Sequence, residues 1–163
     1  MALLGLIAFL PKIAFQAAFK GKYRTSFFQR FGYSFPKIEK KNKGPIVWIH
    51  AVSLGETQAA SALQKRLETE MSDATFVISS TTETGHAAAK RLMPSAHFHV
   101  YMPFDLYLPV KWVLSKCKPD IVILIEGDFW WRFLHEAKKK GAITFVASGK
   151  ISERSCNRLK TFM

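Results

Sequence analysis

The feature that most constrains the fold is an alternation of two kinds of segment that begins at residue 46. Short apolar runs rich in β-branched residues alternate with longer amphipathic stretches. The runs are Ile46–His50, Thr75–Ser79, His97–Tyr101, Ile121–Ile125 and Ile143–Ala147. The stretches between them are Thr57–Glu70, Gly85–Leu92, Pro109–Lys116 and Trp130–Lys140. Strands that alternate with helices form right-handed βαβ units, so the sequence predicts an α/β domain with a Rossmann-like parallel sheet and helices on both faces.

The first amphipathic stretch shows the helical period clearly. Ala59, Leu63 and Leu67 recur at helical spacing, which predicts that they form its buried face. A last helix is expected to begin near Ser152, and the chain stops at Met163. Because a doubly wound domain normally continues beyond such a point, we expect the domain over 46–163 to be incomplete.

The amino-terminal segment is apolar and is followed by basic residues. Residues 1–19 carry only Lys12 and Gln16 as strongly polar side chains, and with Lys20 these form a stripe at a spacing of four. Pro11 would kink a helix there. The pattern favours a membrane-associated helix and basic segment over 1–35, followed by a charged linker over 36–45. A buried core helix is the alternative.

The distribution of charge points to the same kind of partner. The net charge is +12, of which +8 lies in residues 1–50 and only +4 in the rest. A basic excess directly after an apolar segment favours an anionic membrane surface over nucleic acid. The two cysteines, Cys117 and Cys156, lack a CxxC spacing and are expected to be reduced thiols.

Hydroxyl, carboxylate, glycine and lysine residues follow the ends of the expected strands. In open α/β sheets ligands bind beyond the carboxyl ends of the strands, so these residues predict a binding site there. In chain order they are Ser53, Gly55, Glu56, Thr84, Gly85, Asp105, Glu126, Asp128 and Lys150.

Structural roles compete with binding for several of these residues. Ser53 and Glu56 have the spacing of a capping box, an interpretation as well supported as catalysis. Asp105 is also suited to closing a turn, and Asp128 to capping a helix. One or more of the threonines after the second strand should cap the next helix; they are Thr81, Thr82 and Thr84.

Several common ligand motifs are absent from the sequence. No GxGxxG follows the first strand, and neither GxxxxGK[ST] nor HExxH occurs. His97 and His99 share a strand face but have no third ligand, so we predict no metal site. No cofactor is expected.

A resemblance to a known family extends over nearly the whole chain. His50-Ala-Val-Ser53-Leu-Gly55-Glu56 resembles the HAxSxGE signature of bacterial Kdo transferases, which transfer 3-deoxy-D-manno-octulosonic acid. Gly21–Arg24, Gln29–Gly32, the threonine-rich turn ending in Thr84-Gly85, Tyr101–Asp105 and Ile151–Ser155 resemble further family elements.

The resemblance implies a fold and an activity. Such enzymes have the two-domain GT-B fold, and this chain would be the amino-terminal, acceptor-binding half without the donor domain. The implied reaction is metal-independent transfer of Kdo from CMP-Kdo to a lipid A precursor, with Glu56 as general base and the other residues of the rim at the acceptor. The implied location is the cytoplasmic face of the bacterial inner membrane.

Two segments depart from the family pattern. After the fourth strand the family reads ETExWPN, and this chain has Glu126-Gly127-Asp128-Phe129-Trp130-Trp131-Arg132. The family's N-A-R is replaced by Ser148-Gly149-Lys150. A catalytically inactive, membrane-associated binding module is therefore the alternative function.

Overall fold

The sheet has five parallel strands. The structure is a computed structural model that describes residues 24–41, 43–126 and 130–149. The strands are β1 (Ile46–His50), β2 (Thr75–Ser80), β3 (Phe98–Tyr101), β4 (Ile121–Ile125) and β5 (Ile143–Ala147), in the order β3-β2-β1-β4-β5. All pairings are parallel. The predicted strands are confirmed, and only the end of β2 and the start of β3 differ, by one residue each.

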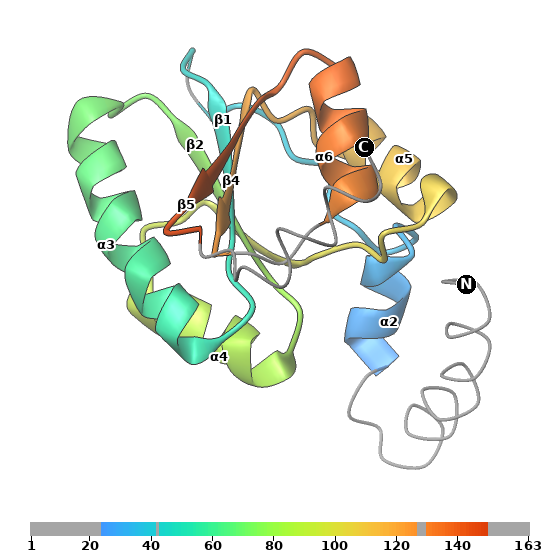
Figure 1. Ribbon diagram of the computed structural model, residues 1–163, viewed down its shortest axis with the longest axis horizontal. Helices are drawn as coiled ribbons and strands as arrows, with labels where there is room; N and C mark the ends of the chain where they lie inside the picture. Colours follow the sequence, from blue (N-terminus) through green and yellow to red (C-terminus); the bar gives the residue numbers. More distant parts are fainter. Residues whose placement is uncertain (1–23, 42, 127–129, 150–163) are drawn as a thin grey trace, which may run out of the picture.

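Helices cover both faces of the sheet, as the sequence predicted (Figure 1). The described helices are α2 (Arg24–Arg30), α3 (Leu54–Glu70), α4 (Glu83–Leu92), α5 (Tyr107–Lys116) and α6 (Trp131–Lys139). Helices α3 and α4 lie on one face, and α5 and α6 lie on the other. Helices α3 and α4 begin earlier than the apolar pattern predicted, because Ser53 and Thr82 cap them upstream.

The central strands are buried on both faces, which is why they read as continuous apolar runs. Every residue of β1 is buried. Val47 and Ile49 belong to the core under α3 and α4, whereas Trp48 belongs to the core under α5 and α6. The ring of Trp48 contacts the ring of Phe133 at a centroid distance of 5.0 Å. This packing fixes how α6 sits over the first strand.

The buried face of α3 differs from the predicted one. Ala59 is exposed, and the fully buried residues are Thr57, Ala60 and Gln64, with Leu63 and Leu67 packed at the margin. Two polar side chains can be buried here because each has a hydrogen-bond partner. The Thr57 hydroxyl donates to the Ser53 carbonyl at 2.8 Å, and the Gln64 amide donates to Glu68 at 2.8 Å. Of the three apolar residues at helical spacing, Leu63 and Leu67 thus pack against the core, and Ala59 does not.

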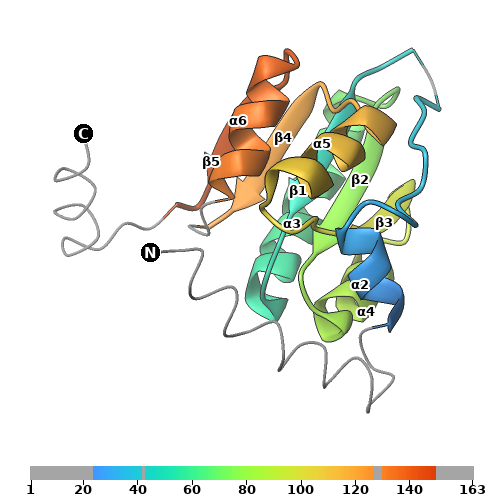
Figure 2. The same ribbon diagram turned by 90° about the vertical axis from the view of Figure 1, so that its right-hand side faces the viewer.

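The segment before β1 packs against the domain. Phe35 and Ile38 are buried in the core under α5. The backbone of α2 contacts the loop after β3, since Phe104 N–H donates to the Arg30 carbonyl at 3.0 Å. Figure 2 shows α2 beside β3. Residues 24–41 are thus packed on the domain, including part of the predicted linker over 36–45. The predicted helix over residues 1–19 lies outside the described residues.

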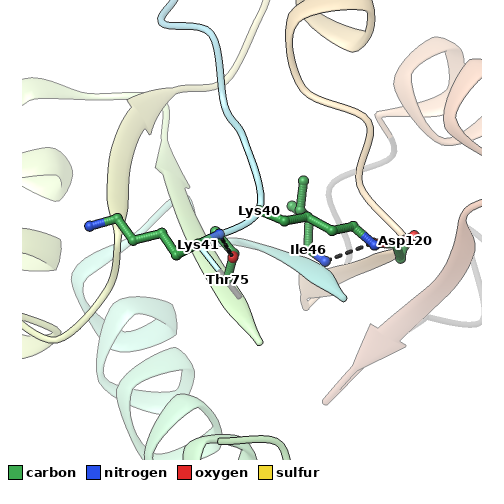
Figure 3. Close-up of polar contacts among 5 residues, drawn as sticks. All are labelled: Lys40, Lys41, Ile46, Thr75 and Asp120. Atoms are coloured by element: carbon green, nitrogen blue, oxygen red, sulfur yellow. Dashed lines mark hydrogen bonds and ion pairs between the residues drawn. The ribbon is translucent and has the colours of Figure 1, made fainter. Parts of the chain in front are cut away.

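The amino end of the sheet holds this segment on two sides (Figure 3). Lys41 N–H donates to the Thr75 hydroxyl at 2.9 Å, and Lys40 forms an ion pair with Asp120 at 3.0 Å. The same carboxylate oxygen of Asp120 accepts from Ile46 N–H at 2.7 Å. Asp120 therefore joins the start of β1 to the segment before it.

Within the part of the chain that the structure describes, none of the helices combines the length and apolar character needed to cross a membrane. Cys117 is a buried free thiol, and burial raises its pKa to about 12. Cys156 lies outside the described residues.

Candidate functional site

The first turn of α3 is an observed capping arrangement. The Ser53 hydroxyl accepts a hydrogen bond from Glu56 N–H at 3.2 Å, and the Glu56 carboxylate accepts one from Val52 N–H at 2.7 Å. These contacts satisfy two backbone donors at the helix start. They also hold the Glu56 side chain in one position at the carboxyl end of β1, so capping and a catalytic role are compatible.

Gly55 leaves open space beside this carboxylate. Among the described residues, a β-carbon added to Gly55 would meet only the Ser53 hydroxyl, at 3.9 Å. The residue is exposed. A ligand can therefore approach the backbone of the first turn of α3 closely, which a side chain at this position would prevent.

The second predicted motif lies beside the first. Thr82 caps α4, because its hydroxyl accepts from Gly85 N–H at 3.0 Å. The Thr84 hydroxyl lies 3.2 Å from that of Thr82. A pocket of about 610 Å³ lies between the starts of α3 and α4, lined by Ser53, Thr82, Thr84, Gly85 and Arg91 among others. The fold thus brings two motifs about thirty residues apart in sequence to one pocket.

Asp105 serves the start of a different helix. Its two carboxylate oxygens accept hydrogen bonds from Arg132 N–H at 3.1 Å and Phe133 N–H at 2.8 Å. Helix α6 has no capping side chain of its own at Trp130. Asp105, from the loop after β3, therefore caps α6 from a distant part of the sequence. Acceptor binding by Asp105 stays a prediction, and both of its oxygens already have backbone partners.

Two residues at the ends of β4 and β5 have left-handed backbone conformations. Glu126 has φ 63° and Ser148 has φ 56°. Glu126 N–H donates to the Ala147 carbonyl at 2.8 Å, which fastens the end of β4 to the end of β5. Non-glycine residues rarely adopt this conformation, and such strain gathers at functional sites. Asp128 and Lys150 lie outside the described residues.

His50 is a site residue that the sequence analysis did not select. It is the last residue of β1 and is buried. Its Nδ1 lies 2.9 Å from the Ser79 hydroxyl, and its ring meets that of Trp130 edge to face at 5.3 Å. Burial and the nearby Arg30 charge lower the pKa of His50 to about 3, so the ring is neutral at physiological pH. Its place as the first residue of the HAxSxGE signature was the available signal.

The described residues contain no group of three His, Cys, Asp or Glu side chains that would hold a metal ion. His97 Nδ1 accepts a hydrogen bond from Phe76 N–H at 3.1 Å, and His99 Nε2 contacts the Met93 carbonyl at 3.1 Å. The two histidines therefore have structural partners.

The fold and the pocket define a class of protein. A parallel sheet of order 3-2-1-4-5, with ligand-type residues beyond its carboxyl ends, is the architecture of a Rossmann-like ligand-binding domain. Residues 25–163 match the family model described as 3-deoxy-D-manno-octulosonic-acid transferase (kdotransferase). The chain belongs to this family. The matching model describes the amino-terminal domain of the family, which corresponds to the Rossmann-like domain of this chain.

Named relatives support the same assignment. The chain is 41% identical over 149 residues to the 3-deoxy-D-manno-octulosonic acid transferase of Chlamydia trachomatis serovar D. The aligned region covers 91% of this chain and 34% of the relative. The chain is 26% identical over 137 residues to the enzyme of that name from Haemophilus influenzae, covering 84% and 32%. It is also 29% identical over 156 residues to a bifunctional glycosyltransferase/methyltransferase of Fusobacterium nucleatum, covering 93% and 24%. The chain spans about a third of the length of the first two relatives.

Proposed function

We propose that this chain supplies the acceptor side of a Kdo transferase. The observation that carries the proposal is the pocket between the starts of α3 and α4, which the HAxSxGE-like and Thr-Gly motifs both line. In the proposed reaction Kdo passes from CMP-Kdo to a sugar hydroxyl of a lipid A precursor. The other half of such an enzyme would bind the donor.

In this proposal Glu56 is the general base. The attacking sugar hydroxyl must lose a proton as its oxygen bonds to the anomeric carbon of Kdo, and a carboxylate can accept that proton. The hydrogen bond from Val52 N–H fixes one oxygen of Glu56 at 2.7 Å. Gly55 leaves the adjacent space open for the acceptor. Both features support a carboxylate held in place before the substrate arrives.

The remaining acceptor contacts are proposed from their positions. Ser53, Thr84 and Gly85 line the pocket, and Arg91 adds a guanidinium suited to a phosphate group. Glu126 lies at the end of β4, and we propose that it and Asp105 shape the site from that side, with Asp128 and Lys150. A phosphorylated glycolipid suits the basic balance of the chain.

We further propose that the protein works at the cytoplasmic face of the bacterial inner membrane. The support is the apolar run over 1–19 and the basic residues that follow it. Deleting residues 1–19 should move the protein from the membrane fraction to the soluble fraction. Continued pelleting of the shortened chain with membranes would contradict this anchor.

The test of the catalytic role is Glu56→Gln in a fusion of this chain to the carboxy-terminal half of the Chlamydia trachomatis relative. The amide oxygen of the new glutamine can still accept from Val52 N–H, so the melting temperature should stay close to that of the unmodified fusion. Transfer of Kdo to the lipid A precursor should fall by about 10²–10⁴, as for loss of a general base.

The matched control is Glu70→Gln, at the other end of α3. Glu70 is exposed and forms an ion pair with Arg66, at 2.7 Å. This variant should transfer Kdo at the unmodified rate. Near-normal transfer by Glu56→Gln would leave Glu56 as a helix cap and refute the catalytic assignment.

A further inference from the structure

Two buried ring nitrogens at the carboxyl edge of the sheet lack partners. His50 Nε2 and Trp130 Nε1 have no hydrogen-bond partner among the described residues. His50 is only 2% exposed, and its ring touches the ring of Trp130. Buried polar atoms nearly always have a hydrogen-bond partner. Two neighbouring ring nitrogens that both lack one therefore need an explanation. Bound ligand atoms are one such explanation.

The surrounding hydrogen bonds assign the His50 tautomer. Trp48 Nε1 donates to the Ser79 hydroxyl oxygen at 2.7 Å, and that hydroxyl donates toward the Met102 sulfur at 3.8 Å. With its proton thus engaged, the Ser79 oxygen is an acceptor for His50 Nδ1–H at 2.9 Å. A neutral imidazole with its proton on Nδ1 has a lone pair on Nε2. His50 Nε2 is therefore an acceptor, and Trp130 Nε1–H is a donor.

The two nitrogens flank the point where the strand order reverses. His50 ends β1, and Trp130 follows β4, which pairs with β1 on the side away from β2. Ligands of open α/β sheets bind at this switch point. On the same edge, Glu56 follows His50 by six residues, in the first turn of the helix after β1. The unpaired atoms thus lie where a substrate is expected.

We propose that His50 Nε2 and Trp130 Nε1 together bind one hydroxyl group of the acceptor's sugar. This inference rests on the acceptor site proposed above. A hydroxyl donates one hydrogen bond and accepts others, so a single group satisfies both nitrogens. A carboxylate has no proton for Nε2, and an ammonium group has no lone pair for Trp130 N–H. The pair therefore suits a group that both donates and accepts, such as a sugar hydroxyl, and two contacts to one hydroxyl would orient the sugar ring.

The decisive measurement is nitrogen NMR on the full chain labelled with ¹⁵N-histidine. The free protein should show His50 protonated on Nδ1 and unprotonated on Nε2. Titration with the lipid A precursor in detergent micelles, with empty micelles as the blank, should shift the His50 Nε2 signal upfield as it gains a hydrogen bond. A protonated Nε2 in the free protein would overturn the proposal. An Nε2 signal unchanged by bound precursor, with other signals shifting, would show an internal water only and also overturn it.

Variants separate this contact from packing. His50→Asn retains an N–H able to reach Ser79 but removes Nε2, and Trp130→Phe retains a ring but removes the N–H. Each should weaken binding of the precursor micelles by about tenfold while the melting transition stays cooperative. The control is His97→Asn, at the amino end of the sheet, where an amide oxygen can still accept from Phe76 N–H. Unchanged affinity in both site variants would refute the hydroxyl contact, whereas failure of the unmodified chain to bind precursor would refute the proposed acceptor site itself.

Discussion

The Asp105 carboxylate accepts a hydrogen bond from Phe133 N–H at 2.8 Å, across 28 residues of sequence. Through this contact the loop after β3 fixes the start of the helix that follows β4. The carboxylate also lies at the amino-terminal, positive end of the α6 dipole. The position of the start of α6 therefore depends on the loop after β3.

Removing this cap should loosen α6. Asp105→Ala leaves the N–H groups of Arg132 and Phe133 without the carboxylate, and we expect a loss of about 1–2 kcal/mol in the free energy of unfolding. Urea denaturation followed by circular dichroism measures it. Asp105→Asn keeps one acceptor oxygen and should lose less than Asp105→Ala. Equal stability of Asp105→Ala and the unmodified chain would show that the contact contributes nothing.

Gly55→Ala separates stability from ligand access. The added methyl group meets the Ser53 hydroxyl at an unstrained 3.9 Å, and alanine is favoured over glycine within a helix by about 0.5–1 kcal/mol. The melting temperature should therefore rise, while binding of the lipid A precursor weakens because the methyl group occupies the approach to α3. Calorimetry and a micelle-binding assay on the same preparation check both. Unimpaired binding would mean that the acceptor does not approach Gly55.

The left-handed backbone at Glu126 predicts a gain in stability on substitution by glycine. Glu126→Gly should raise the free energy of unfolding by about 0.5–1 kcal/mol, because glycine adopts φ 63° without the β-carbon clash. The control is the opposite substitution, Gly141→Ala, at a glycine that also has a positive φ. Its φ is 94° and no described atom lies within 4 Å of an added β-carbon, so any loss there is conformational. A destabilised Glu126→Gly would show that the glutamate side chain compensates for the strain.

His50 should make stability depend on pH below 6.5. Its folded pKa is about 3, below the ordinary 6.5, because burial and Arg30 oppose its charge. The unfolded chain therefore takes up the proton first. The contribution of neutral His50 to the free energy of unfolding is complete above pH 6.5. It falls as the pH drops toward 3, at up to about 1.4 kcal/mol per pH unit. His50→Asn should show a shallower slope than the unmodified chain over that window. Parallel slopes would contradict a buried neutral His50.

Local pattern predicted the strands and the capping residues of two helices well, although both helices begin two or three residues before the predicted starts. The bounds of Ile121–Ile125 were predicted correctly because buried parallel strands are continuous apolar runs. Ile143–Ala147 is a largely exposed edge strand, and its bounds were predicted because β-branched and aromatic residues favour strands. The capping by Ser53 and Thr82 was also visible, since both partners lie within three residues.

Long-range contacts could not be predicted in the same way. Asp105 was predicted to close a turn or to bind the acceptor. No local sequence pattern indicates that it accepts a hydrogen bond from Phe133 N–H. His50 begins the HAxSxGE-like motif but was not predicted to be a site residue. Its meaning depends on Ser79 and Trp130, which only the folded sheet brings to it.

The strand order has a consequence for how the protein folds. Strand β1 pairs with β2, from which only α3 and its loops separate it in sequence. Its other partner, β4, is synthesised only after β2, β3 and the helices between them. Contacts between distant parts of a chain form slowly, since loop closure costs entropy before any pairing rewards it. A nascent chain that has emerged only as far as β3 thus already carries Glu56 and Thr84, yet its His50 still lacks Trp130. The completed contact between His50 and Trp130 would report, in a single tryptophan signal, that both halves of the sheet have joined.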